Sequence, residues 1–260
     1  MLKVTPIACL EDNYAYLLDD GSGDLAIVDP SEEGPVEAAL ARADGKLTAI
    51  FATHHHHDHV GGNEAIAARH SGIRVYGYET DRGRIPCQTE FLRDGQTFTW
   101  GKSEVRAFHI PGHTLGAVAY VIGDAVFTGD TLFLAGCGRL FEGTPAMMFH
   151  SLCEVLGPLG DGMRVYCGHE YTLSNLAFAS SVEPGNARVE QRLAHARAQR
   201  GRGEPTVGSL MSEELATNPF MRCQSAEIRR NMKLGADTPE VEVLAALRRA
   251  KDTFKASKAP

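Results

Sequence analysis

The sequence predicts an α/β fold followed by a smaller, all-helical C-terminal domain. Up to about residue 173, short apolar segments typical of buried strands alternate with helical patterns and turns. Beyond that point only helical patterns remain, interrupted by Pro184, Pro205 and Pro219. Because mixed and all-helical segments form different kinds of packed layer, this change predicts a boundary. We therefore expect domains at residues 1–173 and 174–260.

The expected strands are short apolar or alternating segments bounded by turn residues. In the first part of the chain they cover residues 2–9, 14–18, 25–30, 47–52 and 74–77. Farther on they cover residues 97–100, 105–108, 117–122, 125–128 and 164–167. Helical patterns before the boundary cover residues 36–42, 61–70 and 147–159. Ser31 is the candidate N-cap of the first of these helices.

The most informative segment lies between the strand at 47–52 and the helix at 61–70. Its sequence is Thr53-His54-His55-His56-His57-Asp58-His59. Side chains alternate in an extended segment, so His54 and His56 are expected on the side opposite to His55 and His57. As the chain bends toward the helix, Asp58 and His59 can turn back beside the first pair.

Imidazole nitrogens and carboxylate oxygens are ligands for divalent transition metals. This segment offers too many ligands for one metal ion that keeps an open position, so it predicts a two-metal site. A histidine run is also typical of an expression tag or a low-complexity tract. This run is internal, follows a predicted buried strand and contains an aspartate, which favours the metal site.

Three further candidate ligands follow strand-like segments later in the chain. They are His113, Asp130 and His169, and each one directly follows a glycine. Loops at strand ends are where metal and catalytic residues often gather. Taken alone, each is more typical of an ordinary loop, turn or core residue than of a ligand; together with the histidine-rich segment they supply the ligands for two metals.

Composition excludes several classes of protein. The chain has 260 residues, 43% of them hydrophobic, which is sufficient for a large core. A net charge of −7 argues against an electrostatic nucleic-acid binder. No apolar run is long enough to span a membrane, and the N-terminus does not resemble a signal peptide. The six cysteines form no CxxC pair, so we expect reduced thiols and a cytoplasmic location.

The chain contains the motif THxHxDH, followed by a single histidine, a Gly-Asp and a late Gly-His. This pattern resembles that of the metallo-β-lactamase superfamily. Within it the chain is similar to the glyoxalase II (hydroxyacylglutathione hydrolase) family nearly end to end. The matching stretches are THHHHDHVGGN, PGHT, FTGDTLFLAGCGRLFEGT, CGHEYTLSN, NPFMR and LRRAKDTF. The resemblance implies a four-layer αββα sandwich with a dinuclear metal site on one rim (residues 1–173) and a helical glutathione-recognition domain (residues 174–260).

The resemblance also implies how the ligands divide between the metals. One metal takes His54, His56 and His113, the other takes Asp58, His59 and His169, and Asp130 bridges them. The implied cofactors are two divalent ions, with zinc the leading candidate and iron or manganese as alternatives. Asp58 and Asp130, with a bridging hydroxide, would then be the catalytic groups.

The implied reaction is hydrolysis of S-(2-hydroxyacyl)glutathione, chiefly S-D-lactoylglutathione, to glutathione and D-lactate, the second step of methylglyoxal detoxification. Two metals generate hydroxide near neutral pH and polarise the thioester carbonyl. A thiol leaving group with a pKa of about 8.5 departs largely unprotonated, so no general acid is assigned. The partner is then a small molecule, with no nucleic acid or membrane, and we expect a monomer.

The resemblance assigns glutathione contacts to Arg139, Phe141, Tyr171, Arg248 and Lys251. Some family members have tyrosine where this chain has Phe141, so Phe141 can only pack against the ligand. In the last helix, Arg248 and Lys251 share a stripe with Val241, Leu244, Leu247 and Phe254, whereas Arg249 faces outward. Snorkelling of both cations to water is the alternative.

Other functions remain open at this point. A mononuclear iron glutathione-persulfide dioxygenase of the same superfamily shares much of the metal motif, but the helical tail favours the thioesterase. A β-lactamase is disfavoured because no secretion signal is present. A closed structural zinc site is disfavoured because such sites have four protein ligands, often cysteine.

Overall fold

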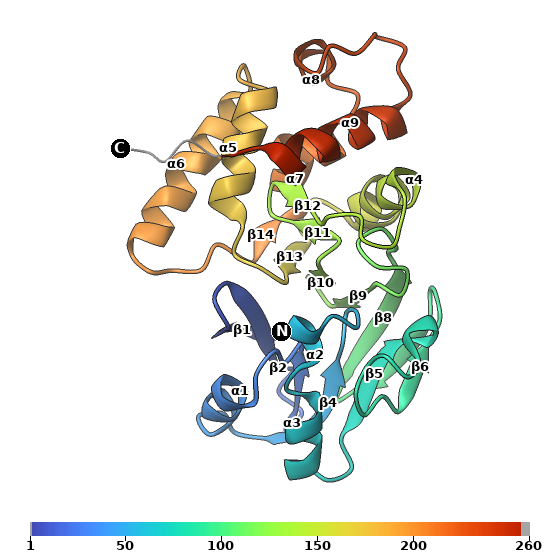
Figure 1. Cartoon of the computed structure of the whole chain (residues 1–260). Helices are drawn as coiled ribbons and strands as arrows, with labels where there is room; N and C mark the ends of the chain where they lie inside the picture. Colours follow the sequence, from blue (N-terminus) through green and yellow to red (C-terminus); the bar gives the residue numbers. More distant parts are fainter. Residues whose placement is uncertain (1, 256–260) are drawn as a thin grey trace.

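The computed structural model describes residues 2–255. Within this range, two six-stranded β-sheets stack face to face, with helices on both outer sides (Figure 1). No helix in the described range is both long enough and apolar enough to cross a membrane. The predicted α/β fold is confirmed, and its four layers are those of the αββα sandwich.

The first sheet has the strand order β1-β2-β3-β4-β5-β6. Its antiparallel N-terminal strands give way to parallel pairs from β3 onward. The bounds are β1 Lys3–Cys9, β2 Asn13–Asp19, β3 Asp24–Val28, β4 Lys46–Phe51, β5 Arg74–Tyr78 and β6 Glu90–Leu92. Helices α1 Glu33–Leu40, α2 His57–Val60 and α3 Asn63–Arg69 connect these strands.

The second sheet has the strand order β14-β13-β10-β9-β8-β7. Because β10 and β13 are parallel, the loops that follow them meet at the same edge of the sheet. The bounds are β7 Thr97–Trp100, β8 Ser103–His109, β9 Val118–Ile122, β10 Ala125–Gly129, β13 Arg164–Cys167 and β14 Ser209–Leu210. A small hairpin, β11 Leu132–Phe133 and β12 Gly136–Cys137, lies beyond β10.

Three apolar clusters hold the layers together. Between the sheets, large aromatic residues pack across the interface, as Phe51 of β4 does against Tyr120 of β9 with ring centroids 5.2 Å apart. On the outer face of the first sheet, α1 and α3 contribute Val36 and Ile66. On the outer face of the second sheet, α4 (Pro145–Phe149) and the C-terminal helices cover a further cluster.

The C-terminal helices gather at one end of the molecule, beyond the second sheet (Figure 1). They are α5 Thr172–Val182, α6 Ala187–Gly201, α7 Met211–Thr217, α8 Ala226–Asn231 and α9 Glu240–Thr253. The expectation that no strand follows residue 173 is wrong at one point, because β14 pairs antiparallel with β13. This strand has two residues, too few to produce a recognisable alternation.

Three other local expectations need correction. Ser31 does not cap α1: the N-cap is Glu32, without a side-chain hydrogen bond, and Ser31 is buried. The helix expected at 61–70 is present as α3, but it begins only at Asn63, and a separate short helix, α2, precedes it before the turn at Gly61 and Gly62. Asp58 and His59 therefore lie in a short helix. The pattern at 147–159 is helical, but its middle, His150–Leu156, is a π-helix.

The last helix, α9, differs slightly from the expected stripe. Val243, Leu244, Leu247 and Arg248 are its buried residues. Val241 is only half-buried, since it lies at the margin of the stripe, and Phe254 follows the last helical residue. Arg249 is exposed, as the sequence predicts.

Candidate metal centre and substrate pocket

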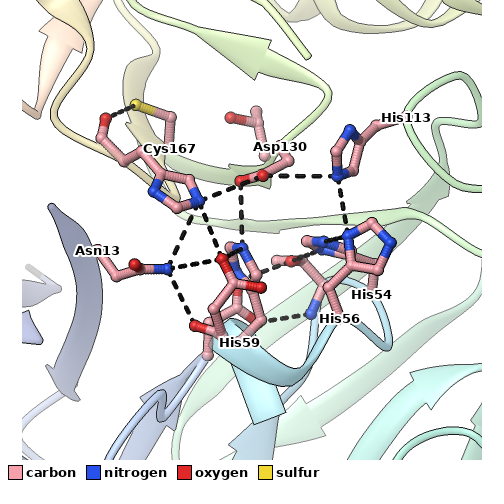
Figure 2. A network of polar contacts seen from close by, with 12 residues as sticks. Asn13, His54, His56, His59, His113, Asp130 and Cys167 are labelled. Carbon is pink, nitrogen blue, oxygen red and sulfur yellow. Dashed lines mark hydrogen bonds and ion pairs between the residues drawn. The ribbon is translucent and has the colours of Figure 1, made fainter. Parts of the chain in front are cut away.

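Seven side chains from separate strand ends meet at one rim of the sandwich (Figure 2). His54 and His56 follow β4, while Asp58 and His59 belong to α2. The loops after β8, β10 and β13 supply the remaining three, His113, Asp130 and His169. All seven predicted ligands thus lie together, and His55 and His57 do not join them. His55 instead contacts Asp81, with 3.1 Å between Nδ1 and Oδ2.

Three histidines form the first triad: His54, His56 and His113. The Nε2 atom of His54 lies 3.1 Å from Nδ1 of His56, and Nε2 of His113 lies 3.0 Å from that same Nδ1. The ring nitrogens of this triad all lie within 4.8 Å of one another. Three nitrogen ligands that converge in this way are suited to zinc or a similar ion.

Asp58, His59 and His169 form the second triad. Oδ2 of Asp58 lies 3.4 Å from Nε2 of His169 and 3.7 Å from Nε2 of His59. This triad therefore offers two nitrogens and one carboxylate oxygen. An anionic ligand distinguishes it from the first triad.

Asp130 lies between the triads (Figure 2). Its Oδ2 atom is 3.5 Å from Nε2 of His113 and 3.3 Å from Nε2 of His169. Its Oδ1 atom is 3.3 Å from Nε2 of His59. One carboxylate therefore contacts both triads, which is the geometry that a bridging ligand requires.

Nε2 of His59 and Oδ1 of Asp130 are buried and lie 3.3 Å apart, but neither atom makes a hydrogen bond. Burying a polar atom without a partner costs free energy, so such atoms point to a missing interaction. A cation held by both would supply it. The residues present therefore fit a pair of divalent metal ions.

The other ring nitrogen of most of these histidines is held by a nearby oxygen. In the first triad, Thr53 Oγ1 lies 3.1 Å from Nδ1 of His54, and the Arg139 carbonyl oxygen lies 2.9 Å from Nδ1 of His113. In the second triad, carboxylate oxygens of Asp29 and Asp12 take these places, at 3.0 Å from His59 and 2.8 Å from His169. Such contacts fix the orientation of a metal-binding imidazole.

The protein's own groups lower the pKa of every histidine in the first triad. Burial is the main cause for all three, and neighbouring imidazoles add to it. The pKa of His56 falls to about 4, and that of His54 lies well below its usual value. These rings are therefore neutral at physiological pH, the form that binds metal.

The second triad has the opposite character. Burial alone would lower the pKa of His169, but hydrogen bonds with Asp130 and Asp58 raise it to about 10. Burial also lowers the pKa of His59, but Asp130 and Asp29 outweigh burial. The pKa of His59 is therefore raised well above its usual value. Carboxylates thus dominate the electrostatics of this triad.

A cavity of about 510 Å³ opens directly onto both triads. Its wall includes all five residues expected to contact glutathione: Arg139, Phe141, Tyr171, Arg248 and Lys251. Phe141 is 62% exposed and lies with its ring centroid 5.2 Å from that of His113. Tyr171 stacks on His169 at 4.8 Å. Aromatic side chains therefore lie beside both triads.

The two cations of α9 are held differently. Arg248 is buried and donates from Nη1 to the Cys137 carbonyl oxygen over 2.7 Å. Lys251 donates to the Ser174 hydroxyl and lies 5.7 Å from the centre of the Phe178 ring. Burial first, and then Arg248, lower the pKa of Lys251 to about 8. The snorkelling alternative does not apply to the guanidinium of Arg248, which stays inside.

Sequence reasoning missed three residues of this centre: Asp12, Asn13 and Asp29. Asp29 accepts hydrogen bonds from the Thr53 amide and hydroxyl and has a φ of 48°, which is unusual for a non-glycine residue. Asn13 donates to Asp58. No local pattern in the sequence indicates these roles, because each depends on a partner far away in the chain.

Comparison with known proteins agrees with this geometry. Residues 10–169 match the family model of the metallo-beta-lactamase superfamily. Residues 170–254 match the model described as the hydroxyacylglutathione hydrolase C-terminus. The two matches adjoin close to the start of α5. The domain division at residue 173 itself stays a prediction.

Full-length relatives are also similar. The chain is 48% identical over 258 residues to the hydroxyacylglutathione hydrolase of Methylococcus capsulatus, a match that covers 98% of this chain and all of that protein. It is 43% identical over 262 residues to the cytoplasmic hydroxyacylglutathione hydrolase of Arabidopsis thaliana, again over 98% and 100%. The crystal structure of ETHE1 from Myxococcus xanthus superposes with a TM-score of 0.64 at 25% identity, covering 96% of this chain and 97% of that one.

Proposed function

The chain belongs to the hydroxyacylglutathione hydrolase family within the metallo-β-lactamase superfamily, and from that membership we propose how its site works. It is a hydrolase that cleaves the thioester bond of S-(2-hydroxyacyl)glutathione. The substrate we propose is chiefly S-D-lactoylglutathione, with glutathione and D-lactate as products. The role that we propose for this reaction in the cell is the second step of methylglyoxal detoxification.

The observation that best supports this proposal is the position of Asp130 between two triads that open onto one cavity. We assign the first triad to one divalent ion, the second triad to another, and Asp130 to both. Zinc is the metal we propose, since imidazole and carboxylate ligands suit it. Two such ions supply a hydroxide nucleophile near neutral pH and polarise a carbonyl oxygen.

The cavity wall suits a glutathione thioester. Glutathione has two carboxylates, and Arg139, Arg248 and Lys251 place three cationic groups on the wall, with Asp252 as a nearby anion. Charge-assisted hydrogen bonds from such groups fix an anionic substrate in one orientation. The tripeptide then lies along the wall, and its thioester reaches the triads at the far end.

The aromatic side chains narrow the approach to the reacting bond. Phe141 lies beside the first triad and Tyr171 beside the second, and both side chains line the cavity through which the thioester would reach the triads. Burial raises the pKa of the Tyr171 phenol to about 12, and it therefore stays a hydrogen-bond donor at neutral pH. Phe141 contributes only packing. No residue is assigned as general acid, because a thiolate leaves without one.

The remaining parts of the proposal concern the setting. A cytoplasmic location is supported by the name of the Arabidopsis relative. We also propose that the chain acts as a monomer.

The test is thioester hydrolysis by protein whose metals have been counted. We expect two metal ions per chain and release of thiol from S-D-lactoylglutathione. Oxygen consumption with glutathione persulfide, together with one iron per chain and no thioester hydrolysis, would instead establish the dioxygenase alternative. One closed zinc without hydrolysis would establish a structural site.

A further inference from the structure

The junction of β1 and β2, which comprises the turn at residues 10–12 and Asn13 at the start of β2, contacts the second triad through two side chains. We propose that Asp12 and Asn13 are positioning residues that hold the ligands of the second metal and leave the first metal unaffected. This inference rests on the two-metal assignment in the proposed function. It goes further, because it proposes that an N-terminal hairpin determines the metal affinity of the second site and not that of the first.

Asp12 acts on His169. Its Oδ1 atom lies 2.8 Å from Nδ1 of the imidazole, which leaves Nε2 directed at the centre. A carboxylate in this place holds the Nδ1 proton, fixes the tautomer and makes Nε2 a stronger ligand. The side chain of Asp12 is 38% exposed, whereas that of His169 is 6% exposed. Asp12 can therefore be changed from the surface without opening the core.

Asn13 acts on Asp58. Its Nδ2 atom donates to the main-chain carbonyl oxygen of Asp58 over 3.0 Å and to the carboxylate Oδ2 over 3.2 Å. The same amide nitrogen lies 3.5 Å from Nε2 of His169 (Figure 2). One buried amide thus spans two ligands of the second triad that come from different parts of the fold, α2 and the loop after β13.

Main-chain hydrogen bonds attach the junction to that loop. The Tyr14 amide donates to the Gly168 carbonyl over 2.8 Å, and the Glu170 amide donates to the Asp12 carbonyl over 2.9 Å. These bonds flank His169 on both sides. The side chains of Asp12 and Asn13 are therefore presented on a fixed backbone, which is what a positioning role needs.

The first triad uses other partners. Thr53 contacts His54, and the Arg139 carbonyl contacts His113. Among residues 2–255, no hydrogen bond or ion pair joins residues 10–13 to the first triad. The junction thus affects one site only. Changes to such outer contacts typically cost 10- to 100-fold in metal affinity.

The test compares Asp12→Ala, Asp12→Asn and Asn13→Ala with Glu11→Gln. Glu11 is an exposed carboxylate in the same junction, so its variant controls for a change of charge. Metal per chain is measured by elemental analysis over a series of buffered free zinc concentrations. We expect Asp12→Ala to raise the free zinc concentration needed to fill the second site by about 10- to 100-fold. The concentration needed to fill the first site should change by no more than about twofold. Asp12→Asn, whose amide oxygen still accepts the Nδ1 proton, should recover part of the loss.

Nuclear magnetic resonance of ¹⁵N-labelled histidine rings identifies the site that is lost. In Asp12→Ala with one equivalent of zinc, the first-triad rings should show bound metal, while the rings of His59 and His169 should not. Thermal unfolding of the metal-free variants checks the fold, because Asn13→Ala removes a buried side chain. Equal weakening of both sites in variants that fold normally, or an effect of Glu11→Gln as large as that of Asp12→Ala, overturns the inference.

These measurements separate this inference from the proposed function. They detect metal and histidine rings and do not need a substrate. A protein that binds two metals with the predicted asymmetry but hydrolyses no glutathione thioester would retain this inference and refute the function. Variants that lose both metals equally, in a protein that hydrolyses glutathione thioesters normally, would refute this inference and retain the function.

Discussion

The two triads of the candidate centre have the same number of ligands but different surroundings. The first consists of neutral histidines oriented by a hydroxyl and a main-chain carbonyl. The second contains Asp58 and is oriented by the carboxylates of Asp12 and Asp29. Negative charge therefore collects on one side of a site whose overall layout is nearly symmetric. The difference means that the two metals should respond unequally to mutation.

The largest effect is expected at Asp130, which contacts both triads. Asp130→Ala should abolish thioester hydrolysis and remove metal from both sites, because the remaining ligands would face two cations without their common anion. Metal analysis and a hydrolysis assay check this. Asp124→Ala is the control. Asp124 is an exposed carboxylate in the turn between β9 and β10, and it forms an ion pair with Arg164. Two retained metals with near-normal turnover would disprove the bridging role.

The next prediction separates the triads. His169→Ala should empty the second site and strongly lower kcat, while the first site stays occupied because its three histidines are intact. His56→Ala should do the opposite. Occupancy is read from elemental analysis after dialysis. Loss of both metals in both variants would mean that the sites assemble cooperatively, and the distinction drawn here would then be too simple.

A smaller effect is expected from the pocket cations, which lie outside both triads. Arg248→Ala or Lys251→Ala should raise KM for glutathione thioesters by about 1.5–3 kcal/mol of lost charge-assisted bonding, or about 10- to 150-fold. Metal content should stay at two, and kcat should change much less. Arg249→Ala, on the exposed face of α9, is the matched control. An equal effect at Arg249 would contradict this orientation of the helix.

The smallest effect concerns pH. Burial lowers the pKa of Lys251 to about 8, so its ammonium is charged below that pH and neutral above it. KM for the anionic substrate should therefore rise by up to about tenfold as the pH passes from 7 to 9, because the charged fraction of Lys251 falls by that factor. In Lys251→Arg, which remains charged throughout, this rise should disappear. A pH profile of KM that is the same in both proteins would exclude Lys251 as its cause.

Much of the fold and of the candidate site could be predicted because local patterns determine it. Alternation in the histidine-rich segment separates His54 and His56 from His55, as observed. The glycines noticed beside the later ligands also have a reason. A Cβ at Gly168 would clash with Asp130 and His59, and Gly129 has a φ of 48° and lies against Thr53. Glycine is therefore needed where the backbone passes the ligands.

What the sequence could not reveal depends on distant contacts. The break between α2 and α3 follows from Gly62 lying against the Pro30 carbonyl of a different segment. The strand β14 exists only because β13 lies next to it. The contacts of Asp12 and Asn13 with His169 form only after the two sheets have packed together, and Asp29 needs partners from the next strand and helix of its own sheet. Such contacts leave no trace in a short window of sequence.

The contact between Asp12 and His169 joins residues 157 positions apart in the chain. Closing a loop of this length costs conformational entropy before the contact contributes any stability. The second triad can thus exist only in a molecule whose two sheets have already packed together, because Asp58 and His59 come from the first sheet's side and His169 from the second's. A metal that binds there adds its binding free energy to the folded state alone. Chelators should therefore speed unfolding and proteolysis of the chain, and the N-terminal hairpin should be the first part to become susceptible.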